Sequence, residues 1–166
     1  MVGRSELSGL QLIQVLARVR IEFIVIGGVA AEFHGLAIPA TIDIDITPSM
    51  DKKNLLRLAS AFDYLDAGLV TADQAGTWFP RLPVENWAQY DMLHLVTRIG
   101  LLDIVFFPAG ARDGYSSLIS DAFDAKVQGI AFNVITIKQW EHLKRSTGRA
   151  KDRRHLRLHR ESEGSA

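Results

Sequence analysis

A short stretch in the first third of the chain alternates strictly between polar or acidic side chains and isoleucines. It reads Thr41-Ile42-Asp43-Ile44-Asp45-Ile46. Because successive side chains of a strand point to opposite faces of a sheet, the pattern predicts a strand with one acidic face and one apolar face. Taken alone, an acidic sheet face is more often solvated than functional.

A third aspartate, Asp103, lies inside the apolar strand predicted for residues 101–106. A lone carboxylate in such surroundings is costly unless a cation or hydrogen bonds compensate it. If this strand lies beside the one that carries Asp43 and Asp45, three carboxylates converge and repel one another, which a shared divalent metal relieves. Oxygen ligands without histidine or cysteine favour Mg²⁺ or Mn²⁺ over zinc. The three aspartates are therefore the candidate catalytic and metal-binding residues.

A glycine pair follows another apolar strand. Residues 23–26 are continuously apolar, as in a strand buried on both faces, and Gly27-Gly28 ends them before a short helix over residues 29–34. Such a pair can be only a tight turn. It can also let backbone N–H groups approach a phosphate at the start of the helix.

The remaining pattern predicts an α+β chain with a small mixed sheet flanked by helices. We read residues 1–166 as a single domain and residues 63–89 as irregular, with room for one short strand. Further helices are expected at about 8–20, 51–62 and 138–160, the last interrupted near Gly148, with strands at 93–96 and 101–106 and a hairpin over 126–135.

Composition narrows the function classes. The chain has no cysteine, which excludes disulfides and thiolate sites and suits the cytoplasm, and no apolar run long enough for a membrane helix or a signal peptide. Neither a Walker A sequence nor a serine-hydrolase elbow is present. The formal charge is zero, but Lys138–Glu161 holds nine basic and three acidic residues. The C-terminal helices should therefore be basic on an otherwise acidic body.

The glycine pair, the spaced aspartates and Leu102-Asp103-Ile104 together resemble the nucleotidyltransferase superfamily of the DNA polymerase β type. The ending, from Leu143-Lys144 through Gly148-Arg149-Ala150-Lys151-Asp152, is similar to the small bacterial nucleotidyltransferases related to the AbiEii toxin of toxin–antitoxin systems. The resemblance implies a fold like the polymerase β palm. It also implies Mg²⁺-dependent transfer of a nucleoside monophosphate from a nucleoside triphosphate, with tRNA or protein as acceptor and an antitoxin protein as a possible partner.

Roles follow position by position from the resemblance. Asp43 and Asp45 would ligate metal, and Asp103 would bind the second ion and act as general base. The nucleotide-binding candidates are Gly27, Gly28, Thr41, Lys144, Arg149 and Lys151.

Relatives commonly carry an arginine before the aspartate strand, whereas residues 36–40 of this chain contain no basic residue. The missing cation makes a catalytically silent nucleotide- or RNA-binding member one alternative. A second alternative, independent of it, is an antibiotic-type adenylyltransferase of the same superfamily with a small-molecule acceptor, which the basic ending disfavours.

Histidines and tryptophans have simpler interpretations. His155 and His159 are spaced as metal ligands can be, but they lack a third ligand nearby, which favours surface positions. His34 and His94 fit structural roles beside the cleft better than catalytic ones. Trp78, Trp87 and Trp140 are expected to pack in or near the core rather than to stack on a base.

Overall fold

The computed structural model describes residues 4–70, 77–78 and 83–164. From the N-terminus to the C-terminus, its helices and strands are α1 (Arg4–Arg18), β1 (Phe23–Ile26), α2 (Gly27–Phe33), β2 (Asp43–Pro48), α3 (Lys52–Tyr64), β3 (Gly68–Leu69), β4 (Thr77–Trp78), the 3₁₀ helix η1 (Val84–Gln89), β5 (Met92–Val96), β6 (Leu101–Val105), α4 (Tyr115–Leu118), the 3₁₀ helix η2 (Ile119–Asp121), β7 (Phe123–Val127), β8 (Ile130–Val134), α5 (Ile137–Thr147) and α6 (Ala150–Glu163).

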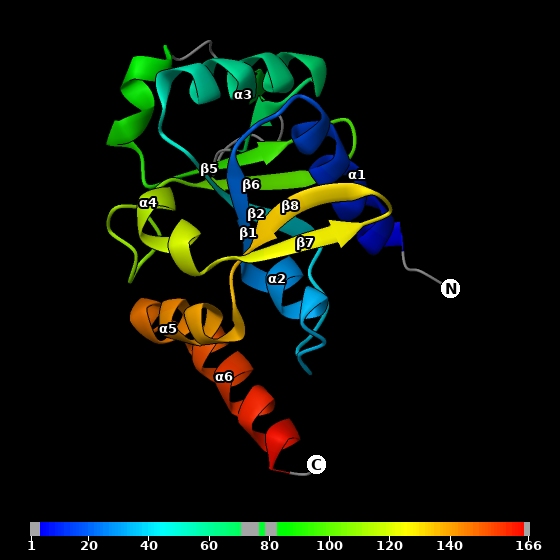
Figure 1. Ribbon diagram of the computed structural model, residues 1–166, viewed down its shortest axis with the longest axis vertical. Coiled ribbons are helices and arrows are strands. Elements are labelled where there is room, and N and C mark those ends of the chain that lie inside the picture. The colour runs from blue at the N-terminus through cyan, green and yellow to red at the C-terminus, as the bar shows by residue number, and fades with distance from the viewer. Residues whose placement is uncertain (1–3, 71–76, 79–82, 165–166) are drawn as a thin grey trace.

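One mixed sheet runs through the molecule, with the strand order β4-β3-β5-β6-β2-β1-β8-β7 (Figure 1). Strand β2 pairs parallel with β6, and β1 pairs parallel with β8, while the other neighbours are antiparallel. The α+β class and the mixed sheet predicted from the sequence are confirmed. The two parallel pairings are what join segments far apart in the sequence at the centre of the sheet.

Side-chain alternation gives the sheet two different faces. On the apolar face, Ile44 and Ile46 of β2 lie level with Leu102 and Ile104 of β6, and all four are buried. Helix α1 packs on this face, and a Cβ at Gly9 would lie 3.7 Å from the side chain of Ile44. The opposite face of β2 carries the aspartates. Helices α5 and α6 lie below the sheet in the view of Figure 1, at the lower end of the molecule.

Helix ends agree with local sequence signals. Asp51 caps α3 by accepting hydrogen bonds from the backbone N–H groups of Lys53 and Asn54. Thr136 and Gln139 form a capping box at the start of α5. Gly148 adopts a left-handed conformation, with φ of 63°, and separates α5 from α6 at the predicted interruption.

Differences from the sequence expectations concern mainly boundaries. Helix α1 begins at Arg4 rather than near residue 8, and α2 begins at Gly27 itself rather than after the glycine pair. The segment read as irregular holds the short strands β3 and β4 and the 3₁₀ helix η1, while residues 71–76 and 79–82 lie outside the described ranges. Within those ranges, no helix combines the length and the apolar character that crossing a bilayer requires.

Candidate active site

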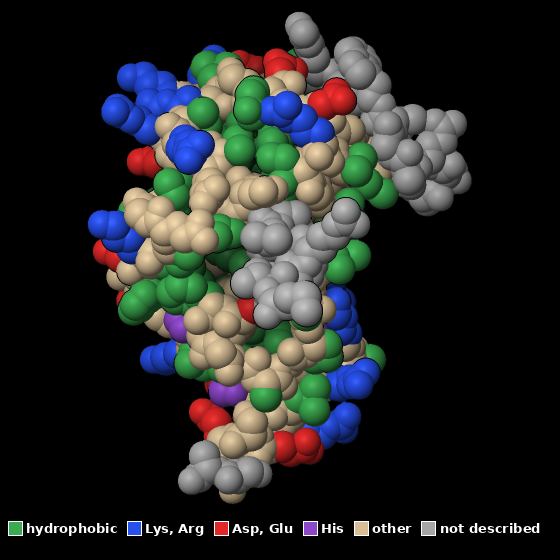
Figure 2. Space-filling view, turned by 90° about the vertical axis from the view of Figure 1, so that its right-hand side faces the viewer, with side chains coloured by type: hydrophobic (Ala, Val, Ile, Leu, Met, Phe, Trp, Pro, Cys, Tyr) green, Lys and Arg blue, Asp and Glu red, His purple; other side chains and the backbone are tan. Residues whose placement is uncertain are grey.

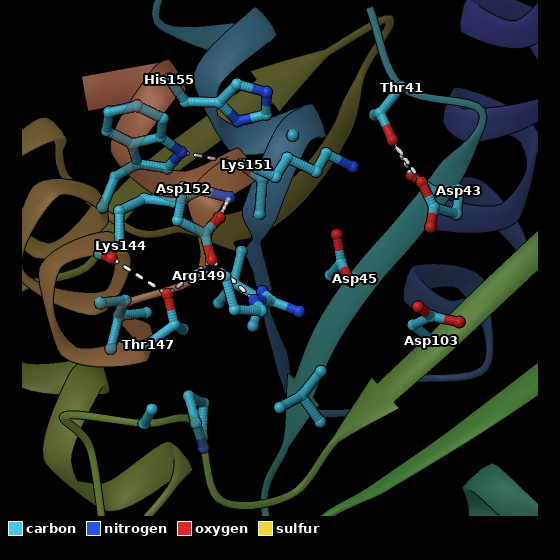
Figure 3. A pocket seen from close by; sticks show the side chains of 18 of the residues that line it. Thr41, Asp43, Asp45, Asp103, Lys144, Thr147, Arg149, Lys151, Asp152 and His155 are labelled. Atoms are coloured by element: carbon cyan, nitrogen blue, oxygen red, sulfur yellow. Dashed lines mark hydrogen bonds and ion pairs between the residues drawn. The ribbon is translucent and has the colours of Figure 1, made fainter. Parts of the chain in front are cut away.

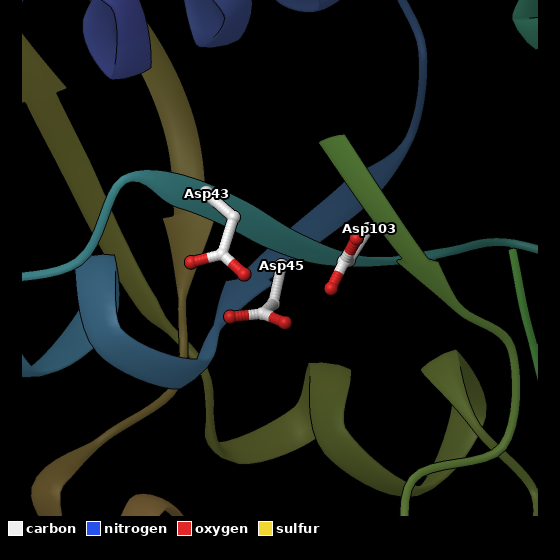
Figure 4. A group of neighbouring side chains, drawn as sticks. All are labelled: Asp43, Asp45 and Asp103. Atoms are coloured by element: carbon white, nitrogen blue, oxygen red, sulfur yellow. The ribbon is translucent and has the colours of Figure 1, made fainter. Parts of the chain in front are cut away.

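The three predicted aspartates meet on the polar face of the sheet (Figure 4). Asp45 of β2 lies directly opposite Asp103 of β6 in the parallel ladder, and Asp43 stands two residues earlier on the same face. One carboxylate oxygen from each of the three lies within 4.8 Å of the others. The pairing of the two strands, which the convergence of the three carboxylates requires, is therefore confirmed.

The pKa values of Asp45 and Asp103 are both raised, mainly by burial. Burial, together with the charges of Asp103 and Asp43, raises the pKa of Asp45 to about 7. Burial also raises the pKa of Asp103, although His94 opposes the shift through a hydrogen bond from Nδ1 to Oδ1 at 2.9 Å. Three carboxylates held this closely are costly when all are ionised, and a divalent cation removes that cost. The donor set therefore fits Mg²⁺ or Mn²⁺.

Glycine is required at position 27 for two reasons. Its φ is +66°, in the left-handed region, and a Cβ there would lie 2.1 Å from Oδ2 of Asp45. A Cβ at Gly28 would lie 2.7 Å from Cγ2 of Thr41. The missing side chains thus let β2 approach the turn closely, and the backbone N–H of Gly28 donates a hydrogen bond to Asp45.

Thr41 holds the first aspartate in place. Its hydroxyl donates a short hydrogen bond to Oδ1 of Asp43, and its own backbone N–H donates to Oε1 of Glu32 at 2.8 Å. These bonds tie the start of β2 to α2 and fix the direction of the Asp43 carboxylate.

The facing wall comes from the junction of α5 and α6 (Figure 3). Asp152 has no exposed surface, yet Lys144 Nζ lies 2.6 Å and Arg149 Nε 2.7 Å from its carboxylate oxygens, and the Thr147 hydroxyl donates a further hydrogen bond. Burial acts to raise the pKa of Asp152, but these bonds outweigh it and lower the pKa to about 2. A carboxylate that is ionised at neutral pH therefore fixes two cations at the site.

A hydrogen bond links the two walls. The indole Nε1 of Trp140 in α5 donates to the carbonyl oxygen of Gly27 at 3.1 Å, and the Trp140 side chain is almost wholly buried. The ammonium of Lys144 lies 5.8 Å from the Trp140 ring centre. The position of the cations relative to the glycine turn is thus set by the docking of α5.

A cavity of about 740 Å³ lies between the walls. All nine site residues predicted from the sequence line it: Gly27, Gly28, Thr41, Asp43, Asp45, Asp103, Lys144, Arg149 and Lys151. Arg149 and Lys151 extend toward the aspartate strand (Figure 3). Pro39 and Ala40, which end the segment 36–40 that has no basic residue, line the same cavity. Its cations come instead from α5 and α6.

Sequence reasoning missed two groups that shape the site. Asp152 and Thr147 carry no pattern that separates them from surface residues, because their bonds form across the junction of α5 and α6. His94, in contrast, has the structural role beside the cleft that was expected of it. The surface placement of His155 and His159 is wrong: their exposures are 6% and 3%, because both face inward from α6. Trp87 and Trp140 are buried, as expected.

Comparison with known proteins gives a fold but no sequence family. No protein-family model matches the chain, and no curated protein is significantly similar to it. Among solved structures, it is similar to the Thermotoga maritima protein TM1012, described as "a putative nucleotidyltransferase". The TM-score is 0.57 at 14% identity, covering 95% of this chain and 93% of that one. It is also similar to the antibiotic-resistance factor ANT(2″)-Ia, with a TM-score of 0.55 at 13% identity over 96% and 84% of the two chains. The chain has the nucleotidyltransferase fold.

Proposed function

We propose that the protein is a Mg²⁺-dependent nucleotidyltransferase that moves a nucleoside monophosphate from a nucleoside triphosphate to a hydroxyl of RNA. The observation that carries the proposal is the convergence of Asp43, Asp45 and Asp103 within 4.8 Å, beside a glycine turn and opposite a wall of fixed cations. This arrangement combines ligands for a divalent ion with groups that bind phosphate.

The residues divide the work by position. Asp43 and Asp45 would hold the ion that binds the triphosphate, and Arg149 and Lys151 would contact the phosphates from the opposite wall. Bound Mg²⁺ would neutralise the triphosphate and acidify the acceptor hydroxyl. The acceptor oxygen forms a bond to the α-phosphorus, the bond to the β-phosphate oxygen breaks, and pyrophosphate leaves. Asp103 takes the hydroxyl proton, and the rise of its pKa on burial favours this role as a base.

Exposed basic residues on α6 support RNA as the acceptor. Arg153, Arg154, Arg157 and Arg160 are all exposed. Figure 2 shows Lys and Arg side chains gathered on one side of the lower part of the molecule, where α6 lies. Phosphate backbones bind such surfaces by displacing counter-ions. We further propose, from the resemblance of the C-terminal segment, that the activity is that of a cytoplasmic toxin with an antitoxin partner.

Transfer of label tests the proposal. Purified protein is incubated with Mg²⁺, total RNA and each of the four α-labelled nucleoside triphosphates. We expect label in RNA from one or more of them, none with Asp45→Asn, and wild-type transfer with Asp63→Asn, which changes an exposed aspartate of α3.

Other outcomes contradict all or part of the proposal. No transfer to any acceptor in whole-cell extract would refute the enzyme and leave the silent nucleotide-binding member. Label in protein, or in one of a panel of antibiotics offered alone, would refute RNA as the acceptor while keeping the chemistry. The antibiotics are included because the chain is similar in structure to the antibiotic-resistance factor ANT(2″)-Ia. Growth arrest on expression of the wild type, but not of Asp45→Asn, is expected for a toxin.

A further inference from the structure

Strand β7 forms one edge of the sheet. It pairs with β8 and with no other described strand, so the outer side of its backbone has no strand partner among the described residues (Figure 1). Open strand edges are templates for pairing with another chain, and proteins usually blunt them. In this protein the edge sequence is Phe123-Asp124-Ala125-Lys126-Val127, and its side chains have a pattern that is complementary to itself.

The hairpin turn decides which backbone groups point outward. Gln128 and Gly129 form the two-residue loop, with φ of 50° and 79°, as in a type I′ turn. Val127 and Ile130, which flank such a loop, form a hydrogen-bonded pair, and hydrogen-bonded pairs recur at every second residue. The N–H and C=O groups of Asp124 and Lys126 therefore point away from β8, toward the open edge.

The two outward residues carry opposite charges. Asp124 and Lys126 are both exposed, they lie on the same face of the strand, and neither forms an ion pair with a described residue. On the other face Phe123 is 49% exposed. One face of the edge thus presents two charges, neither of them in an ion pair with a described residue. The other face presents Phe123, whose half-exposed ring also packs against Phe33 of α2, with the ring centres 5.8 Å apart.

We propose that β7 is the docking surface for β7 of a second copy of this chain, in an antiparallel pairing centred on Ala125. In this register Asp124 lies opposite the second copy's Lys126, and the reverse, so that both opposite-charge pairs form directly across the strands. Phe123 lies opposite the second copy's Val127 on the other face. The outward N–H and C=O groups of Asp124 and Lys126 are then all hydrogen bonded.

Charge selects this register over its neighbours. Shifting the pairing by two residues in either direction keeps the backbone hydrogen bonds possible but places Asp124 opposite Asp124, or Lys126 opposite Lys126. Like charges directly opposite each other destabilise a strand pair. Because each copy contributes this same edge, the pairing is two-fold and closes at two copies.

Charge reversal tests the pairing. Sedimentation velocity of the full chain over a concentration series should show a reversible dimer, since an interface of one short strand is small. Either Asp124→Lys or Lys126→Asp alone should raise the dissociation constant at least about tenfold, because two attractive pairs become repulsive. The double variant Asp124→Lys with Lys126→Asp should restore dimerisation. A wild type that stays monomeric, or a dimer indifferent to the single changes, would overturn the proposal.

A cross-link tests the register separately. The chain has no cysteine, so Ala125→Cys introduces one unique thiol at the centre of the pairing. The two Ala125 residues form a non-hydrogen-bonded pair, in which Cα atoms lie about 4.5 Å apart, within disulfide range. Mild oxidation should give a covalent dimer with Ala125→Cys and none with Phe123→Cys, whose thiol faces the second copy's Val127. The reverse result, or equal cross-linking of the two, would exclude this register.

Both tests read association and not catalysis. Substitutions in β7 leave the aspartates and the cavity lining unchanged, so each variant should transfer nucleotide as a monomer if the proposed function is right. Failure of either proposal can therefore be recognised without the other.

Discussion

The raised pKa of Asp45 predicts that the metal-free protein becomes less stable as the pH rises. In the folded chain this carboxyl has a pKa of about 7, against 3.8 as its ordinary value. Between these values the folded state holds a proton that the unfolded state has lost. Stability is therefore full below about pH 4, falls as the pH rises toward 7, and stays reduced above that value.

The magnitude follows from the size of the shift. A difference of about three pKa units, at 1.36 kcal/mol each, corresponds to roughly 4 kcal/mol. Salt screens part of the repulsion from the two neighbouring carboxylates, so we expect about 2–4 kcal/mol in practice. Replacing the carboxyl by a neutral amide removes the penalty. Asp45→Asn should accordingly be more stable than the wild type at pH 8 and nearly equal to it at pH 4.

Urea denaturation in EDTA, followed by circular dichroism at several pH values, measures this difference. Adding Mg²⁺ at pH 8 should stabilise the wild type, by about 2.7 kcal/mol at a hundred times the dissociation constant, and leave Asp45→Asn nearly unchanged. Asp63→Asn, in an exposed position on α3, should follow the wild type throughout. If Asp45→Asn lost stability with pH as steeply as the wild type, the pKa of Asp45 would not be raised. Ionising the three carboxylates would then carry no cost for a metal ion to remove.

Three further changes test other parts of the site. Gly27→Ala should abolish transfer. It should also lower stability by more than the ~1–2 kcal/mol of left-handed strain, because its Cβ meets Asp45. In thermal melts the control Gly35→Ala, with φ of +68° and open space around it, should show the strain alone. Asp152→Asn should lower the free energy of unfolding by about 2–4 kcal/mol at pH 7. The wild-type carboxyl has a pKa of about 2, against an ordinary 3.8, so this difference in stability should vanish as acid titrates it. Ala40→Arg adds a cation to the cavity lining, and steady-state kinetics should show a KM for the nucleoside triphosphate roughly tenfold lower, whereas an unchanged KM would mean that α5 and α6 already supply every phosphate contact.

Local patterns predicted the parts of the fold that depend on neighbours in sequence. Alternation placed Asp43 and Asp45 on one face of β2, and the glycine pair marked the end of β1, because both signals lie within a few residues. The parallel pairing of β2 with β6 has no local signal. Only the cost of burying Asp103 pointed to it. That carboxylate needs a compensating cation or hydrogen bond, and the rest of its own strand, which is apolar, provides neither.

The opposite wall shows where such reasoning stops. Lys144 and Arg149 are recognisable from the resemblance of the ending, but the role of Asp152 depends on the angle at which α6 leaves Gly148. A buried aspartate in a basic helix has the same sequence appearance as an exposed one. For the same reason His155 was misplaced: the face of α6 that turns inward is set by packing against α5, and the apolar residues of α6 are too few to reveal it.

The hydrogen bond from Trp140 to Gly27 joins residues that are 113 positions apart. A contact of such separation requires a long loop to close, and the entropy cost of closing it must be met before the contact contributes. The aspartate face can assemble once β6 has paired, but the cations arrive only when α5 and α6 dock. During synthesis a ribosome-bound chain would therefore carry the acidic half of the site first. If the proposed function is right, the wall of cations would join the aspartates only after α5 and α6 have emerged and docked.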